Sequence, residues 1–232
     1  LMTAESADLE KIAEAFVECE RMGIKVLPPD INESRLNFTY IDDQNIRFGL
    51  LAIKNLGNDV IESMIEERDT HGPFVDLADF VSRIHHRAFN KKALEALTKA
   101  GALDRFRERG QILANMDQIL LYNKAVQQEK LQNQASLFAS SPNMEIATLR
   151  LRPAPEVSGF VKLAWERELL GLYVSAHPTE ALITKAPDAF TRMNKAMTSP
   201  DGTFVYLCVG VGEPKVIMTK KQEAMAFVPV ND

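Results

Sequence analysis

Residues 50–65, LLAIKNLGNDVIESMI, and residues 96–113, ALTKAGALDRFRERGQIL, share one pattern. In each stretch an apolar helix end runs into a tight turn, at Gly57 or Gly101, and a new apolar helix follows. Such a turn leaves several backbone N–H groups pointing outward at a helix N-terminus, where the helix dipole also favours an anion. The repeated pattern therefore predicts two short helical hairpins, each able to hold an anion.

Hairpins of this kind form helix-hairpin-helix modules, which grip a DNA phosphate without reading a base. Ile53 and Leu56 are the predicted apolar anchors of the first turn. The first turn is predicted to face DNA with Lys54, Asn55 and Gly57, and the second with Lys99 and Gly101 beside Ala100 and Ala102. Ordinary glycine turns between solvated helices have the same spacing, so this second interpretation stays open.

A local excess of basic residues lies around the second turn. Between Arg83 and Arg109, eight Lys or Arg stand against three acids, a local net charge of +5 in a chain whose formal net charge is −5. The acidic total argues against a protein that coats nucleic acid indiscriminately, but the basic stretch is typical of a phosphate-facing surface. The further predicted DNA-binding residues are Lys91, Lys92, Arg105 and Arg107.

The patterns outside these hairpins predict a mainly α chain with small β elements. Residues 1–50 combine a helix with a β-hairpin around the DDQN turn, and residues 51–125 form the helical module. Residues 126–160 are rich in Gln, Asn, Ser and Pro and are predicted to be a flexible linker. Residues 161–200 are again helical, and residues 201–232 have β character.

The sequence predicts no catalytic or metal-binding residues. The paired acids of YIDD, residues 40–43, belong to the expected DDQN turn, and the four histidines have no partner at metal-ligand spacing. Cys19 and Cys208 are too few for a disulfide framework and are predicted to be reduced. With no membrane-spanning run and no signal peptide, we expect a cytoplasmic protein without membrane contact.

The stretch QASLF, residues 134–138, lies in the most polar part of the chain. Leu137 and Phe138 have no apolar neighbours there, so they form either a collapsed pair within the linker or a plug for a partner's pocket. The chain begins at Leu1 without an initiator Met and ends as a strand pattern begins, which leads us to expect a piece of a longer protein.

Several longer strings together resemble one family, the bacterial replicative DNA polymerase III alpha subunit of the DnaE type. These strings are ECERMGIKVLPPDINES (18–34), IRFGLLAIKNLG (46–57), GPFVDLADFVSRI (72–84), NKKALEALTKAGALD (90–104) and LAWERELLGLYVSAHP (163–178). The resemblance runs in one register from about Ala15 to Asp232. It implies that 1–50 ends the fingers region, that 51–125 is a tandem helix-hairpin-helix domain, and that 201–232 opens an oligonucleotide-binding (OB) β-barrel.

The resemblance also implies partners. The hairpins would contact double-stranded DNA, other polymerase III holoenzyme subunits would assemble with the parent protein, and the QASLF peptide would dock into the beta sliding clamp. Gln134 would be the polar anchor of this peptide and Leu137 and Phe138 its apolar plug, with Ala135 and Ser136 between them. The parent would be a DNA-directed DNA polymerase, a nucleotidyltransferase that uses Mg²⁺, and its palm residues would lie outside this chain.

One departure from the family pattern concerns the turns. Asn55 and Lys99 stand where many such hairpins have Gly or another small residue, which bears on how closely each turn approaches a phosphate. Two other functions remain open from the sequence. One is an independent helix-hairpin-helix DNA-repair enzyme such as a glycosylase, with Asp104 as the nearest candidate acid. The other is a helical interaction scaffold without DNA contact.

Overall fold

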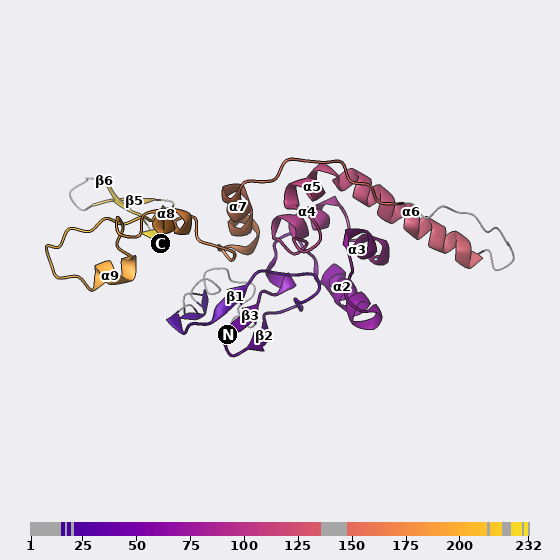
Figure 1. The fold of residues 1–232 in the computed structure, drawn as a ribbon, viewed down its shortest axis with the longest axis horizontal. Helices are drawn as coiled ribbons and strands as arrows, with labels where there is room; N and C mark the ends of the chain where they lie inside the picture. The colour runs from indigo at the N-terminus through magenta and orange to yellow at the C-terminus, as the bar shows by residue number, and fades with distance from the viewer. Residues whose placement is uncertain are drawn as a thin grey trace. The chain divides into compact units, whose positions relative to one another are not determined.

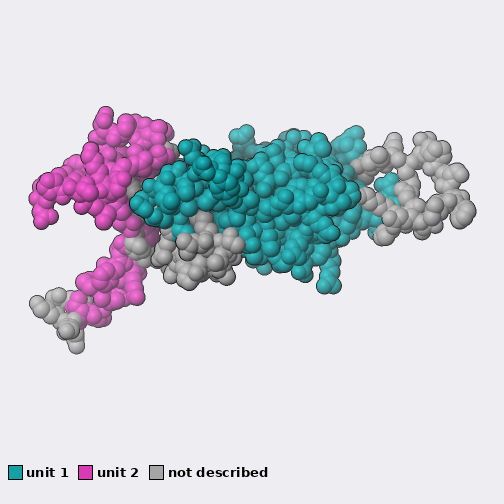
Figure 2. Space-filling model, turned by 90° about the horizontal axis from the view of Figure 1, so that it is seen from below, with its two compact units in different colours: residues 1–175 teal, residues 176–232 magenta. Residues whose placement is uncertain are grey.

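The computed structural model describes residues 15–16, 18–19, 21–135, 148–212, 214–219, 224–228 and 230–231. The chain divides into two compact units, Leu1–Ser175 and Ala176–Asp232, which Figure 2 distinguishes by colour. The described residues are mainly helical with small sheets, as predicted. No helix among them has the length and apolar character needed to cross a membrane.

The first unit starts with a small three-stranded sheet of β1 (Lys25–Leu27), β2 (Thr39–Asp42) and β3 (Asn45–Arg47). The strand order is β1-β3-β2, with β1 parallel and β2 antiparallel to β3. The carboxylate of Asp42 accepts the Gln44 N–H at 2.9 Å, so an Asp side chain closes the DDQN turn. The apolar stretch after β3 leaves the sheet at Gly49 and turns into a short 3₁₀ helix, η1 (Leu50–Ala52).

The helices that follow are arranged as Figure 1 shows, and their buried apolar residues belong to one core. Three of their N-termini are capped by side chains, because Asp76 accepts from the Asp79 N–H, Asn90 from the Ala93 N–H and Glu108 from the Gln111 N–H. The bounds of these helices are α2 Asn58–His71, α3 Leu77–Arg83, α4 Lys91–Lys99, α5 Arg109–Ala114 and α6 Met116–Ala135.

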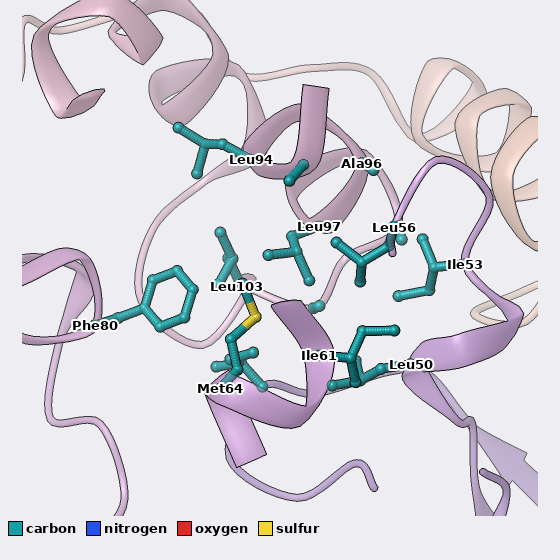
Figure 3. Packing of buried hydrophobic residues seen from close by; sticks show 14 of the residues in the cluster. Leu50, Ile53, Leu56, Ile61, Met64, Phe80, Leu94, Ala96, Leu97 and Leu103 are labelled. Carbon is teal, nitrogen blue, oxygen red and sulfur yellow. The ribbon is translucent and has the colours of Figure 1, made fainter. Parts of the chain in front are cut away.

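The core joins both predicted hairpins. Figure 3 shows Ile53 and Leu56 of the first turn lying near Leu97 of α4, with Ile61 and Met64 of α2 nearby. All five side chains are buried. Burying an aliphatic side chain of this size contributes about 1.5–3 kcal/mol, so this shared core holds the hairpins together.

The region assigned to the linker is more ordered than expected at both of its ends. Helix α6 continues to Ala135, so residues 126–135 are helical. Residues 148–158, here called the strap, are extended and cross the surface of α5 and α6, where Leu149 and Leu151 pack against the core. The Asn115 side chain donates to the Arg152 carbonyl at 3.0 Å and accepts the Arg152 N–H at 2.8 Å. Apolar anchors and this amide pair therefore fix the strap.

Helix α7 (Gly159–Leu170) follows the strap and ends at Gly171, whose left-handed backbone (φ 82°) stops the helix. It packs against α4, as Figure 1 shows. The peptide predicted to bind the clamp lies outside the described residues, except that the backbone of Gln134 and Ala135 forms the end of α6.

Among its described residues, the second unit contains α8 (Glu180–Lys185), α9 (Met193–Met197) and four short strands. Strands β5 (Lys215–Met218) and β6 (Ala224–Phe227) form an antiparallel hairpin, and β4 (Gly210–Val211) pairs with β7 (Val230–Asn231). The β character predicted for this segment is present. The start of an OB fold stays a prediction, because these short pairs do not define a barrel.

Candidate nucleic-acid interface

The turn of the first hairpin, residues 53–57, has buried apolar residues on its inner side and an exposed outer surface. Ile53 and Leu56 are buried, whereas Lys54, Asn55 and Gly57 are exposed. The three residues predicted to face DNA at this turn are therefore accessible.

Asn55 has an unusual backbone conformation. Its φ is 68°, and it is the one residue other than glycine with a positive φ in the part of the chain that the structure describes. The left-handed region is costly for most side chains, but Asn visits it more readily because its short amide can bond locally. Asn thus performs the conformational task that glycine performs in many such turns, and adds an exposed amide to the tip.

The N-terminus of α2, directly after this turn, is uncapped. Gly57 is the cap residue, with φ −79° and ψ 149°, and supplies no side-chain acceptor. The first backbone bond into the helix is from the Ile61 N–H to the Gly57 carbonyl, at 3.3 Å. The N–H groups of residues 58–60 therefore have no helical partner, as at any helix start. Together with the dipole of a 14-residue helix they favour an anion, although the exposed Asp59 in the first turn opposes it.

Gly57 differs from glycines that the fold itself requires. A Cβ placed on Gly57 would meet nothing within 4 Å, and its φ is negative, so neither space nor backbone strain demands glycine here. An absent side chain on an exposed helix start leaves room for a ligand's backbone to approach closely.

The turn of the second hairpin is closed. Gly101 is buried with φ 88°, and a Cβ placed there would lie 2.5 Å from Nη2 of Arg109. Its N–H donates to the Thr98 carbonyl at 3.1 Å, and the next N–H, of Ala102, donates to the Leu97 carbonyl at 3.0 Å. Gly101 faces the Arg109 guanidinium and not solvent, so this geometry does not support its predicted contact with a DNA phosphate, which stays a prediction. Its glycine serves the backbone conformation instead.

The start of α5 is likewise occupied by the chain itself. The carboxylate of Glu108, the cap residue, accepts the Gln111 N–H at 3.1 Å and the Val157 N–H of the strap at 3.1 Å. Burial raises the pKa of Glu108, but these N–H donors and Lys162 outweigh it and hold the pKa below its ordinary value. A Cβ on Gly110 would lie 2.7 Å from the Pro155 carbonyl oxygen. A carboxylate and the strap thus fill the place where a phosphate would bind.

Most of the basic residues counted in the sequence are paired with acids. Lys91 binds Asp117 at 2.8 Å and Arg105 binds Asp30 at 3.0 Å. The other paired cations are Arg83 with Glu67 and Asp79, Lys99 with Glu95, and Arg109 with Asp104 and Glu166. Several of these acids lie outside residues 83–109, so the local charge of +5 overstates the field. Within the described ranges, Arg87, Lys92 and Arg107 form no ion pair.

Two further observations bear on the alternatives. The Asp104 carboxylate is held by Arg109 at 2.7–3.1 Å, which makes it a structural partner and not an available acid for glycosylase chemistry. No group of His, Cys, Asp and Glu side chains suited to a metal ion occurs among the described residues.

Sequence reasoning missed the role of α7. The backbone N–H of Lys54 donates to the Leu169 carbonyl at 3.0 Å, so the end of α7 supports the first turn. Glu166 and Lys162, also on α7, pair with Arg109 and Glu108 at the start of α5. No local pattern signals these contacts, because each joins segments about 50 or more residues apart.

Comparison with known proteins gives this fold its class. Residues 23–112 match the family model of the helix-hairpin-helix motif. The first turn, residues 53–57, and the helix α2 after it lie inside this range. The chain therefore contains a helix-hairpin-helix module.

The relatives are more specific. The chain is 38% identical over 178 residues to DNA polymerase III subunit alpha of Thermus aquaticus, a match that covers 77% of this chain and 14% of that protein. It is 39% identical over 183 residues to the subunit of Deinococcus radiodurans (78% and 14%) and 32% identical over 235 residues to that of Vibrio cholerae (100% and 20%). The resemblance to DNA polymerase III alpha subunits is confirmed, and the chain spans a seventh to a fifth of their length.

Proposed function

We propose that the chain is a non-catalytic part of a DNA polymerase III alpha subunit that binds duplex DNA through its first hairpin. The observation that supports this most is the open N-terminus of α2, where uncapped N–H groups stand beside the exposed Lys54 and Asn55 and a glycine that the fold does not require. Backbone donors and a lysine recognise phosphate and sugar, not base edges. The binding is therefore independent of base sequence.

The second hairpin is closed to ligands. This supports binding of DNA mainly at one phosphate-binding site, the N-terminus of α2. Because Glu108 fills the start of α5 and Gly101 is buried, the second hairpin contributes packing to the shared core. Lys92, Arg87 and Arg107, which form no ion pair within the described ranges, attract DNA electrostatically without binding one particular phosphate. Few phosphate contacts give weak binding to the isolated chain, with a steep loss as salt rises.

Tethering to the beta sliding clamp is the second part of the proposal. It is supported by the QASLF pattern at residues 134–138 and by the similarity to the alpha subunit over this region. The described segments on both sides are anchored on the first unit, since Asn123 of α6 donates to the Ile84 carbonyl at 2.9 Å and Asn115 holds the strap. If this chain and the clamp are held on the same DNA, the peptide has a high effective concentration near its partner, so a modest affinity suffices.

The whole protein would perform template-directed DNA synthesis with Mg²⁺ at a palm site outside this chain, together with other holoenzyme subunits. The direct test of the DNA-binding part is fluorescence anisotropy of a labelled blunt duplex titrated with the chain. We expect weak binding that is equal for unrelated sequences and falls linearly in log K against log salt. Absence of binding at low salt, or a strong base preference, would contradict the proposal.

A further inference from the structure

The first hairpin is held from outside its own sequence, by α7. We propose that Glu166 of α7 is a positioning residue for the first hairpin: it fixes α7 on α5 so that the Leu169 carbonyl holds the Lys54 turn in the conformation that binds phosphate. This inference deepens the proposed DNA binding and rests on it. Helix α7 lies outside residues 23–112, which match the helix-hairpin-helix model.

Two ion pairs attach α7 to the start of α5, and the acid belongs to α7 in one pair and precedes α5 in the other. The consecutive residues Glu108 and Arg109 pair with Lys162 and Glu166, which lie one turn apart on α7. The distances are 3.1 Å from Lys162 Nζ to Glu108 Oε1 and 3.1 Å from Arg109 Nη2 to Glu166 Oε1. A shift of α7 by one turn would bring like charges together, so this arrangement specifies a single register.

Glu166 is fully engaged at this site. Its side chain is 1% exposed and accepts from the N–H groups of Val174 and Ser175, at 3.2 and 3.0 Å, as well as from the Ser175 hydroxyl at 2.9 Å. Arg109, which is 4% exposed, also donates to the Lys99 carbonyl at 2.9 Å. A buried ion pair tolerates little displacement, because every lost bond leaves a charge without water or partner.

The other end of α7 reaches the first turn. Leu169 and Leu170 are buried in the core at 3% and 0% exposure, and the Leu169 carbonyl accepts the Lys54 N–H at 3.0 Å. Carbonyls in the last turn of a helix have no intrahelical partner, so this one is available to the hairpin. Glu166 lies three residues before Leu169 on the same rigid helix. Displacement at Glu166 is therefore transmitted to the turn.

Anion binding depends on the Lys54 turn keeping a single conformation. Lys54 directly precedes Asn55, which adopts its left-handed conformation only while the turn is maintained. If the Lys54 N–H loses its acceptor, the turn samples other conformations, and binding must then restore order at a cost in free energy. The N–H groups at the start of α2 and the Lys54 side chain would no longer be preorganised for one phosphate.

The test compares Glu166→Gln with Glu168→Gln. The Glu168 side chain is exposed on the same helix and makes no hydrogen bond or ion pair with the described part of the chain, so it is a matched control. Amide hydrogen exchange at Lys54 is the first readout, with the Phe80 N–H, bonded to Asp76, as a core reference. We expect exchange at Lys54 to rise about tenfold more than exchange at Phe80 in Glu166→Gln, with no change at either amide in the control.

Duplex binding is the second readout. We expect Glu166→Gln to bind DNA about three- to tenfold more weakly than wild type at equal salt, whereas Glu168→Gln binds at least as well because it removes an exposed acid. Arg109→Lys, which keeps the charge but not the planar fork, provides the same test if Glu166→Gln does not fold. Wild-type exchange at Lys54 in a folded variant would overturn the positioning role. A wild-type chain that binds no DNA would instead overturn the proposed function, because the exchange result does not depend on DNA.

Discussion

Arg109 and Glu166 are 57 residues apart in sequence, yet Nη2 of Arg109 lies 3.1 Å from Oε1 of Glu166 and both side chains are buried. Burial lowers the pKa of Arg109, but Asp104 and Glu166 outweigh this and raise it above its ordinary value. The pair joins the second hairpin to the helix that supports the first. The helix-hairpin-helix module of this chain is thus completed by a segment that follows the strap.

Removing one partner of this pair should destabilise the first unit strongly. Arg109→Met leaves Glu166 charged and buried, and loss of one member of a buried pair typically costs about 3–5 kcal/mol. Urea unfolding followed by the fluorescence of Trp165, the only tryptophan, would measure the change. The control Arg87→Met, at an exposed residue without an ion pair in the described ranges, is expected to stay within about 0.5 kcal/mol of wild type. Equal stability of the two variants would contradict the prediction.

The two hairpin glycines should respond differently to alanine. Gly57→Ala meets no atom within 4 Å and keeps an allowed φ, so we expect little loss of stability but weaker DNA binding. Gly101→Ala forces a left-handed residue, at about 1–2 kcal/mol, and also displaces Arg109. Thermal unfolding and duplex anisotropy on both variants separate the two roles. A large loss of stability in Gly57→Ala would show that the fold requires this glycine after all.

The salt dependence of DNA binding should report on Lys54. Lys54→Gln is expected to weaken binding equally for all sequences and to reduce the slope of log K against log salt by about one. Lys91→Gln is the matched control, because Lys91 is already paired with Asp117 and should contribute little. The measurement is anisotropy at four or more salt concentrations. An equal change in the slope of log K against log salt in both variants would argue against the first hairpin as the phosphate-binding site.

Clamp binding should depend on the QASLF peptide. The triple change of Gln134, Leu137 and Phe138 to Ala is expected to abolish binding to the sliding clamp and to leave thermal unfolding unchanged. The reason is that a docked peptide gains most of its affinity from a few anchors in a pocket. Calorimetric titration against the clamp tests this, with Gln132→Ala as the control outside the motif. Unchanged affinity in the triple variant would disprove the assignment.

The stability of the first unit should fall in acid partly through Glu108. The pKa of Glu108 is depressed in the folded chain, so its contribution is present above the unfolded value of about 4.3 and is lost as pH falls through the folded value. Glu108→Gln should therefore be less stable than wild type at pH 7, and the gap should narrow as pH falls below about 4.3 and close below the depressed folded pKa. Melting temperatures across this range measure the effect. A gap independent of pH would mean that the carboxylate charge plays no part.

Many local features were predictable from the sequence because their causes are local. Asn90 caps α4, an Asp side chain closes the DDQN turn, and Ile53 and Leu56 are buried where the apolar spacing places them. Each depends on interactions within a few residues of the chain.

The surface charge was less predictable. Arg105 and Lys91 are predicted to face DNA, and in the structure they pair with Asp30 and Asp117 from distant parts of the sequence. A net charge summed over a window omits acids that the fold brings in from elsewhere. Such pairing follows from packing, and packing depends on the whole core.

The sequence by itself determined where the two turns lie, which residues anchor them and which family they resemble, since turn chemistry and apolar period act over a few residues. Only the tertiary structure decided that the first turn is open and the second closed. Gly57 and Gly101 look alike in sequence, but Glu108, the strap and the Arg109–Glu166 pair cover only the second. The physical reason is that a helix start is free for a ligand only if no other segment of the chain satisfies its donors, and that depends on contacts across about 50 or more residues.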